Sequence, residues 1–580
     1  MATRTYIAAL LFCLSLLISE RAIAGSFLVS SKAELEVAVS LAQPGDSIIL
    51  KDQVWAGVEM LFTCKGTAEQ PINICPETPG GASLEAGSRI EIGGEYLVVS
   101  GFRIVNGSNL NSAVLFSSGE VKAYHCRLSH CLIDGWNPPD LSTKYHWVVL
   151  HGGYNRVDHC RFSNMNHRGV TLMVKAGADQ VGHHQIDHNF FGPKPEGDGN
   201  GYETIKMGGG DYSMYPLYTL VERNYFYRCD GETELISNKS WENIYCYNTF
   251  FECMGTLTLR WGRQCRVEGN YFLGNGRKET GGIRITDQDH LVINNYLQNI
   301  QGDRARAAIS VMSGIPDIEG GNSGHGQTKN ARILHNTMVN CRESLNLGYY
   351  DDDDLGDPRG DIKPPENCTV ANNILWSSHA PLIKEDWAPS INTTWYTNIA
   401  FGAALGLEPD SGISILDPML EKAPPGIYKI TTGSPALNSG SITSDTVHLD
   451  FEMQMRADGL PDIGSDEWSD EHTENLPVGP EDVGPDWYNA TGKLNYFAAL
   501  QSLEVYPNPA SQKFYLNLLK ICPTSDVQIE IVDLGGRLVY SEKFLNICSN
   551  PEIVLEHEKG LHLVRVRTSS GIYHTKIILK

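Results

Sequence analysis

Val267-Glu268-Gly269-Asn270 and, 25 residues further on, Val292-Ile293-Asn294-Asn295 carry the pattern that decides the fold. An aliphatic residue is followed by two variable residues and an asparagine, and the pattern recurs along the middle of the chain. Further copies are Ile186–Asn189, Val221–Asn224, Ile333–Asn336 and Val370–Asn373, with a looser one at Tyr245–Asn248. The successive asparagines are separated by 35, 24, 22, 25, 41 and 37 residues. The short intervals suit one coil of a parallel β-helix, and the long ones suit coils with an inserted loop.

An asparagine that returns once per coil at a turn can form a ladder of side-chain amide hydrogen bonds along the axis. We therefore assign these asparagines a structural role and no chemistry. A leucine-rich repeat is excluded because the repeat region has no Leu-x-x-Leu-x-Leu pattern. A propeller is disfavoured because one short strand motif per repeat does not supply four strands. The sequence thus predicts an all-β protein built on a parallel β-helix.

Composition limits the partners and the compartment. The formal net charge of -23 argues against a nucleic-acid partner, because no basic field attracts phosphates. Residues 1–24 have the features of a secretory signal peptide: Arg4, an apolar run and Ala22-Ile23-Ala24 before Gly25. No later stretch approaches the roughly 18 consecutive apolar residues of a transmembrane segment. The cysteines of the repeat region are expected to fill the interior of the coils, although disulfides stay open in an exported protein.

The C-terminal end has a different character. We expect the β-helix over residues 25–465 and an acidic linker with Pro477, Pro480 and Pro485 over residues 466–498. Short alternating strands then predict a small β-sandwich over residues 499–580. This part resembles the C-terminal sorting domain of the bacterial type IX secretion system, through Tyr506-Pro507-Asn508-Pro509-Ala510, Asp533–Arg537 and the closing Lys576–Lys580. The resemblance implies export by that machinery, so the protein is expected to be secreted or held at the bacterial cell surface.

Charged residues mark a candidate site in the repeats. Glu232 and Glu234 stand two residues apart, so a strand would place both carboxylates on one face. Lys239 follows five residues later, Arg260 lies 21 residues beyond it, and Arg284 a further 24. Each interval is close to one coil, and neighbouring coils lie about 4.8 Å apart. We therefore expect the three basic residues to stack in a stripe.

The chemistry of this group has two interpretations. The glutamates are either a general acid/base pair for glycoside hydrolysis or oxygen ligands for Ca²⁺. The nearby Lys239 favours a charge-balanced cation site, and Asn200, in a glycine-flanked turn, is a neutral oxygen donor that would complete it. Lys206, 33 residues before Lys239, extends the basic stripe. Such a stripe on an acidic protein suits an anionic uronate polysaccharide.

Longer motifs carry a family resemblance. Asn200–Lys206, Asp230–Ser240, Gly255–Arg260, Asn155–Cys160, Gly269–Gly276 and Gly281–Ile285 resemble polysaccharide lyase family 6, which contains alginate lyases and chondroitinase B-type enzymes. The likeness runs from about residue 25 to 490. It implies a right-handed parallel β-helix and Ca²⁺-assisted β-elimination that leaves an unsaturated uronate end.

The resemblance also implies roles for individual residues. Asn200, Glu232 and Glu234 match the calcium ligands, Lys239 the general base and Arg260 the general acid. Lys206 and Arg284 match basic positions that hold substrate carboxylates. These lyases usually have histidine after the catalytic arginine, whereas this chain has Trp261, which we expect to stack on a sugar ring.

Three functions stay open at this point. An alginate lyase is favoured, because Gly281–Ile285 and Asp462–Glu467 look closer to the alginate group. A chondroitinase B-like dermatan sulfate lyase is the nearest alternative. A non-catalytic surface protein that binds polysaccharide through the same stripe is the third, and the presence of both Lys239 and Arg260 argues against it.

Overall fold

The structure is a computed structural model of the whole chain. It describes residues 24–109, 111–209, 212–316, 324–350, 362–408, 411–442, 449–456, 459–469, 476–489, 505–506, 510–516, 518, 526–533, 537–545, 550–555, 558–568 and 571–579. Apart from Ala24, the predicted signal peptide lies outside these residues, as does part of the predicted linker. Among the described residues, no helix combines the length and the apolar character needed to cross a membrane.

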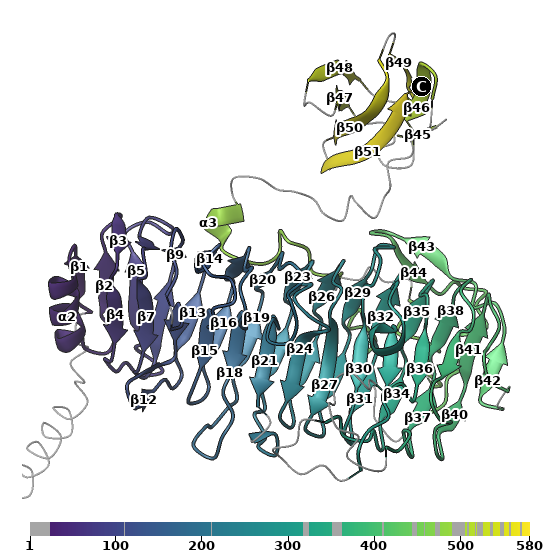
Figure 1. Ribbon diagram of the computed structural model, residues 1–580, viewed down its shortest axis with the longest axis horizontal. Helices are drawn as coiled ribbons and strands as arrows, with labels where there is room; N and C mark the ends of the chain where they lie inside the picture. The colour runs from purple at the N-terminus through teal and green to yellow at the C-terminus, as the bar shows by residue number, and fades with distance from the viewer. Residues whose placement is uncertain are drawn as a thin grey trace, which may run out of the picture.

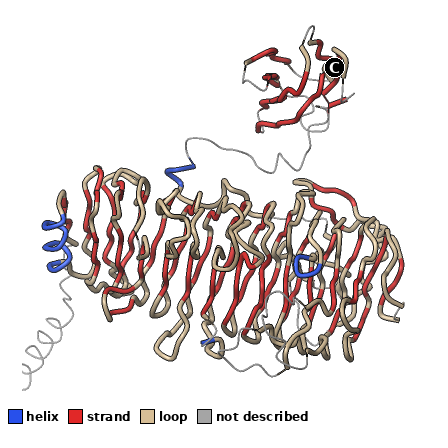
Figure 2. The backbone as a smooth tube through the Cα atoms, viewed as in Figure 1, coloured by secondary structure: helices blue, strands red, loops and turns tan. Residues whose placement is uncertain are grey.

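Three long parallel sheets form a stack of coils, which confirms the predicted right-handed β-helix (Figures 1 and 2). Each complete coil contributes one strand to each sheet, as in the successive strands β22 Leu220–Glu222, β23 Tyr225–Tyr227 and β24 Glu234–Lys239. The first sheet contains β1 Ser26–Val29, β2 Ser47–Leu50, β5 Ile72–Pro76, β8 Leu97–Ser100, β13 Arg127–Ser129, β16 Arg156–Asp158, β19 Gln185–Asp187, β22 Leu220–Glu222, β25 Ile244–Cys246, β28 Arg266–Glu268, β31 Leu291–Ile293, β34 Arg332–Leu334, β37 Thr369–Ala371 and β40 Thr394–Tyr396.

The second sheet follows the asparagine turns. It contains β3 Val54–Ala56, β6 Ser83–Glu85, β9 Arg103–Ile104, β14 Leu132–Asp134, β17 Arg161–Ser163, β20 Phe190–Phe191, β23 Tyr225–Tyr227, β26 Thr249–Phe251, β29 Tyr271–Leu273, β32 Tyr296–Gln298, β35 Thr337–Val339, β38 Ile374–Trp376, β41 Asn398–Phe401 and β42 Ile413–Ile415.

The third sheet holds the charged residues of the candidate site. It contains β4 Glu59–Phe62, β7 Arg89–Ile92, β10 Val114–Leu115, β15 Val148–Leu150, β18 Leu172–Val174, β21 Ile205–Gly208, β24 Glu234–Lys239, β27 Thr256–Trp261, β30 Ile283–Ile285, β33 Ile309–Val311, β36 Leu345–Leu347 and β39 Ile383–Glu385. Additional elements are the helix α2 Lys32–Leu41, the pairs β11 Ser117–Ser118 with β12 Val121–Lys122 and β43 Glu421–Ala423 with β44 Ile427–Lys429, the 3-10 helix η2 Arg304–Arg306 and the short helix α3 Asp486–Asn489.

The predicted asparagine ladder is confirmed. Each side-chain amide except that of the last member, Asn398, donates to the carboxamide oxygen of the asparagine one coil further on, at 2.9–3.0 Å. The ladder consists of Asn189, Asn224, Asn248, Asn270, Asn295, Asn336, Asn373 and Asn398. The same oxygens also accept the backbone N–H of the preceding ladder residue, for example Asn248 N–H to Asn270 at 3.0 Å. A fixed asparagine at this turn therefore sets the register of successive coils.

Apolar side chains stack along the interior of the coils. Phe226, Phe250 and Phe272 have ring centroids 4.6 and 4.4 Å apart, close to the spacing of neighbouring strands. The described cysteines are free thiols, and all except the half-buried Cys75 are buried, as the sequence predicted. At the N-terminal end, α2 buries Leu35 and Ala38 against the first coils and covers their open edge.

Described residues of the segment predicted as a linker contact the coils. Val478 and Val483 join an apolar cluster on the outside of the second sheet. Trp487 Nε1 donates to the His130 carbonyl at 2.8 Å, and Gly484 N–H donates to the His188 carbonyl at 2.9 Å. The domain boundaries remain a prediction, but this stretch is anchored at the points described.

The C-terminal domain is a small β-sandwich. One sheet contains β45 Val505–Tyr506, β46 Lys513–Leu516 and β49 Glu552–Val554, and the other contains β47 Val527–Asp533, β48 Leu538–Phe544, β50 Gly560–Thr568 and β51 Gly571–Leu579. Phe514, Ile529 and Val564 belong to a core shared by both sheets. This core is separate from that of the β-helix.

Candidate functional site

Two long strands of the third sheet position the central residues. β24 and β27 each have six residues, whereas the next strand, β30, has three. The pairing of β24 with β27 shifts between Asn238 and Lys239, so that Lys239 lies opposite Trp261 and Arg260 is the extra residue of a bulge. The bulge turns Arg260 toward Glu234, and the two side chains form a buried ion pair.

Glu234 is held in its charged form. The residue is 6% exposed, and burial alone would favour the protonated acid. The positive charges of Arg260, Lys239 and Arg284, together with a hydrogen bond from Ser237, outweigh burial and hold the pKa of Glu234 well below its usual range. The pair therefore places a fixed guanidinium beside Lys239.

Lys239 is buried and lies against an aromatic ring. Its side chain is 8% exposed, and Nζ lies 5.1 Å from the centroid of the Trp261 ring. Burial lowers the pKa of Lys239, Glu234 opposes this shift, and the positive charges of Lys206 and Arg260 add to it. A lysine with a lowered pKa reaches its neutral form more readily, which is the form that accepts a proton.

The carboxylates of Glu203, Glu232 and Glu234 repel one another beside Lys239 and Arg260. The pKa of Glu232 is raised to about 8 by burial and by the negative charges of Glu203 and Glu234, although Gly201 N–H donates to its Oε2 at 2.8 Å. Glu203 is 1% exposed and pairs with Lys206 at 2.6 Å. The crowded Glu232 is the group that a bound divalent cation would relieve.

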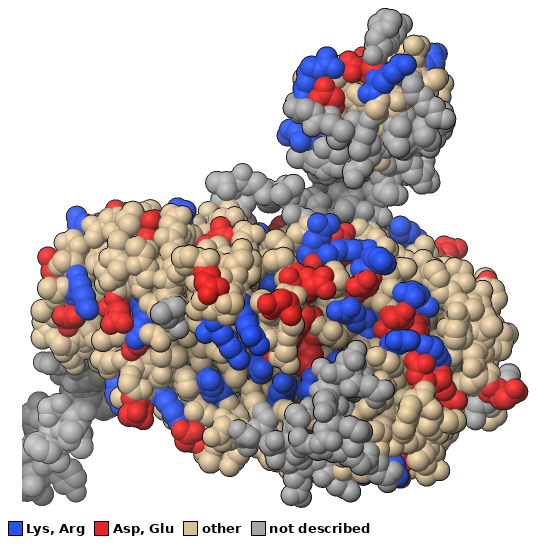
Figure 3. Space-filling view, viewed as in Figure 1, with Lys and Arg blue, Asp and Glu red and all other residues tan. Residues whose placement is uncertain are grey.

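The predicted calcium ligands share one cleft. Asn200, Glu232 and Glu234 line a cavity of about 380 Å³, together with Arg260 and Arg284. The oxygen donors and the unrelieved repulsion at Glu232 therefore fit a hard cation such as Ca²⁺. On the face viewed in Figure 3, basic and acidic side chains lie side by side over the middle of the coil stack.

The basic residues occupy two rows instead of the single predicted stripe. Lys206 pairs in register with Ser237, Ser237 with Thr258, and Thr258 with Arg284, so Lys206 and Arg284 share one row three coils apart. Lys239 lies two residues further along β24, in the row of Trp261. The register partners Lys206–Ser237 and Thr258–Arg284 are 31 and 26 residues apart, two residues different from the 33 and 24 on which the single stripe was drawn, and this is the reason for the two rows.

Three residues of this neighbourhood escaped the sequence analysis. Glu203 stands inside the motif Asn200–Lys206, so the signal was present and was not used. Arg306, from η2, lines the cleft and donates to Thr233 Oγ1 at 3.2 Å. His325 is fully buried, and its Nε2 lies 3.0 Å from Nη2 of Arg284. Neither Arg306 nor His325 falls at a repeat position that would have marked it.

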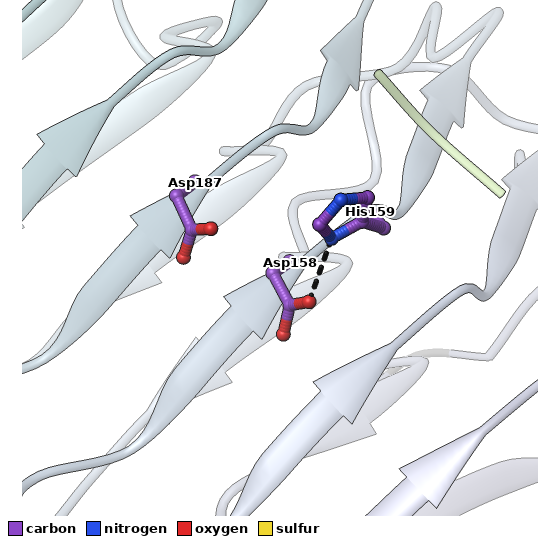
Figure 4. A group of neighbouring side chains, drawn as sticks. All are labelled: Asp158, His159 and Asp187. Atoms are coloured by element: carbon purple, nitrogen blue, oxygen red, sulfur yellow. Dashed lines mark hydrogen bonds and ion pairs between the residues drawn. The ribbon is translucent and has the colours of Figure 1, made fainter. Parts of the chain in front are cut away.

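Two other acidic groups have structural partners. Figure 4 shows Asp158, His159 and Asp187 on adjacent coils of the first sheet. Arg127 donates to Asp158 at 2.6 Å and Arg156 to Asp187 at 2.8 Å, so the group is a neutralised charge ladder. The second group consists of Asp450, Glu452 and Asp466. Lys429 pairs with Glu452 and the Ile430 N–H donates to Asp466 at 3.2 Å, which ties this segment to β44.

Comparison with known protein families gives two matches. A family model described as Chondroitinase B matches residues 29–433, well over half of the chain. A second model, described as a secretion system C-terminal sorting domain, matches residues 504–580. No curated protein matches the sequence.

Several solved structures are similar to this chain. The PL6 family alginate lyase AlyGC is 30% identical with a TM-score of 0.69, over 84% of this chain and 60% of AlyGC. This chain thus corresponds to about three fifths of the length of that enzyme. A mannuronic acid specific polysaccharide family 6 lyase from human gut microbiota is 30% identical with a TM-score of 0.58, over 65% of this chain and 86% of the other. The PL6 lyase Pedsa3628 from Pseudopedobacter saltans is 25% identical with a TM-score of 0.55, over 67% and 96%.

Proposed function

Because the chain belongs to the Chondroitinase B family of polysaccharide lyases, we propose that it cleaves a uronate-containing polysaccharide by calcium-assisted β-elimination, with alginate as the favoured substrate. The observation that carries the proposal is the buried Lys239 with its lowered pKa, held beside the Arg260–Glu234 pair. Preference for alginate rests on the two alginate-related neighbours that are 30% identical to this chain.

In the proposed reaction Lys239 is the general base. Its neutral amine takes the proton from C5 of the uronate, and the electrons of the C5–H bond form the C4=C5 double bond. The C4–O bond to the neighbouring sugar breaks, and that oxygen leaves with its electron pair. The product carries an unsaturated uronate end. A lowered lysine pKa favours this step because the amine must be uncharged before it accepts the proton.

Arg260 is proposed to stabilise the leaving oxygen. A guanidinium keeps its proton because its pKa exceeds about 12, so its main contribution is a fixed positive charge and hydrogen-bond donors. The proton that the oxygen needs comes from a water molecule that Arg260 orients. Glu234 holds Arg260 in place within the low-dielectric site.

Asn200, Glu232 and Glu234 are proposed to hold the cation. A bound Ca²⁺ would supply Lewis-acid neutralisation of the uronate carboxylate, which makes the C5 proton more acidic. Arg284 and Lys206, on one row of the third sheet, are proposed to bind substrate carboxylates.

The role of Trp261 has two parts. That it stacks on a sugar ring stays a prediction. Its side chain is 8% exposed and its Nε1 donates to the Gly324 carbonyl at 2.8 Å, which supports a second role in shielding Lys239 from water. Shielding keeps the pKa of Lys239 low because the ammonium form loses hydration.

Export completes the proposal. The sorting domain at residues 504–580 supports transfer by the type IX secretion machinery, to the medium or to the cell surface. Residues 1–24 would first direct the chain into the secretory pathway. An enzyme placed there meets a polysaccharide too large to enter a cell.

Ultraviolet absorbance of the unsaturated product tests the proposed function. The purified protein is incubated separately with alginate and with dermatan sulfate, with Ca²⁺ or with a chelator. We expect a rise on alginate that is lost on chelation and in Lys239→Ala. The control is Lys384→Ala, which removes a lysine from the same sheet that is already paired with Asp386 at 3.1 Å.

Each other outcome has a defined meaning. A rise only on dermatan sulfate favours the second candidate, which the description of the matching family supports. Binding of either polymer without any rise, in folded protein with Ca²⁺, would contradict the proposed elimination and favour a non-catalytic binding protein.

A further inference from the structure

A short segment after η2 reaches back to the candidate site. The carbonyl of Gly324 accepts the indole N–H of Trp261 at 2.8 Å, and His325 contacts Arg284. Thr328 Oγ1 fastens the segment: it lies 2.8 Å from the Met312 carbonyl and 3.0 Å from the Ile285 carbonyl, which share its single proton. The segment from Gly324 to Thr328 therefore contacts two side chains of the site, Trp261 and Arg284.

The contact between His325 and Arg284 has only one chemically consistent direction. A guanidinium carries donors and no acceptor, so Nη2 of Arg284 donates to Nε2 of His325 at 3.0 Å. An imidazole that accepts at Nε2 is neutral and carries its proton on Nδ1. Burial and the positive charges of Arg284 and Arg260 hold the pKa of His325 well below its usual range, in agreement with this direction.

Arg284 depends on such a partner because it is almost fully buried. It is 1% exposed, yet it lines the cleft that holds Glu232 and Glu234. A buried charge is costly unless hydrogen bonds compensate it, and the Glu234 carboxylate also attracts this guanidinium. An uncharged acceptor, His325 Nε2, holds the guanidinium without neutralising it.

We propose that His325 is a positioning residue that acts through Arg284, orienting its guanidinium toward a carboxylate of the anionic polysaccharide. The inference rests on the proposed function, because it takes that polysaccharide as the ligand of Arg284. His325 itself touches neither substrate nor cation in this scheme. Its acceptor nitrogen is uncharged, so it adds no negative charge beside Arg284.

Binding measured in a Lys239→Ala background tests the proposal without any turnover. Calorimetry with an alginate oligosaccharide and Ca²⁺ compares His325, His325→Gln and His325→Leu. Glutamine places an amide oxygen near the position of Nε2, whereas leucine has no acceptor. We expect Leu to weaken binding about tenfold and Gln to stay within about threefold, as for loss or retention of one charge-assisted hydrogen bond.

A double-mutant cycle separates positioning from a general structural effect. In an Arg284→Ala background, His325→Leu should cause no further loss of affinity, because its effect passes through the arginine. His290→Leu is the matched control: His290 is also fully buried, and its Nδ1 accepts the backbone N–H of Cys265 at 3.2 Å instead of a donor from Arg284. We expect that variant to unfold at a lower temperature with unchanged affinity.

Several results would overturn the proposal. They are equal losses for Gln and Leu, an equal loss for Leu with and without Arg284, or no binding of the oligosaccharide by the Lys239→Ala protein. Turnover by the unmodified protein is measured separately, so a failure of the proposed elimination is distinguishable from a failure of the role given to His325.

Discussion

Replacing Asn270 by alanine should reveal how much the asparagine ladder stabilises the coils. Asn270 Oδ1 accepts both the backbone N–H and the side-chain amide of Asn248, each at 3.0 Å. Its own amide donates to the Tyr245 carbonyl at 2.9 Å and to Asn295 Oδ1 at 2.9 Å. All of these partners are buried, so water cannot replace the lost bonds.

The magnitude follows from the groups left without a partner. The backbone N–H of Asn248 loses its acceptor, which costs about 1–3 kcal/mol for a buried donor. The Tyr245 carbonyl loses a donor, for about 1 kcal/mol more, and the small cavity adds about 1 kcal/mol. The expected loss in the free energy of unfolding is therefore about 3–5 kcal/mol.

Urea unfolding followed by circular dichroism measures this loss. Asn340→Gly is the control: its side chain is exposed, donates to Asn299 Oδ1 at 2.9 Å, and its φ of 51° suits glycine. We expect the control to change the free energy of unfolding by less than about 0.5 kcal/mol. If Asn270→Ala costs less than about 1 kcal/mol, or no more than the control, the ladder does not stabilise the coils as argued.

Three further outcomes concern the site. Because the pKa of Glu232 is about 8 in the metal-free protein, Ca²⁺ binding at pH 7 should release close to one proton and weaken as the pH falls below 8. Calorimetry in two buffers of different ionisation enthalpy measures that proton, and its persistence in Glu232→Gln would contradict the assignment. Only neutral Lys239 accepts a proton, and its pKa is lowered, so kcat/KM should rise with pH through a midpoint below the usual lysine pKa of about 10.4. The variant Lys239→Arg is permanently charged and should be inactive. Trp261→Ala should admit water to Lys239 and so move the midpoint of the kcat/KM pH profile to higher pH, whereas Trp261→Phe should move it less. An unmoved midpoint in Trp261→Ala would exclude the shielding role.

The repeat made the architecture predictable from sequence. One asparagine per coil, followed by aromatic residues, reports both the spacing of the coils and the side chains that stack inside them. The strands of the C-terminal domain were predicted less completely. Glu552–Val554 was not expected as a strand, because three residues carry too little alternation to stand out.

The candidate site was predicted in its membership and not in its geometry. Glu232, Glu234, Lys239 and Arg260 stand in short motifs that a single sequence exposes. The register shift at Lys239, which pairs Arg260 with Glu234, depends on how two strands fit together. Residue patterns along one strand do not show its register with the strand of the next coil. A prediction from sequence spacing alone therefore placed the basic residues in one row.

The sequence by itself determined the coil repeat, the asparagine ladder, the sorting domain and the residue types that make up the site. Those features are local, since each is written in residues a few positions or one coil apart. Only the tertiary structure decided that Glu203 crowds Glu232, that the indole of Trp261 is tied to Gly324, and that His325 holds Arg284 from 41 residues away. Such contacts arise when a loop of variable length folds back on the coils, and their free energy depends on burial and charge that exist only after the coils have stacked.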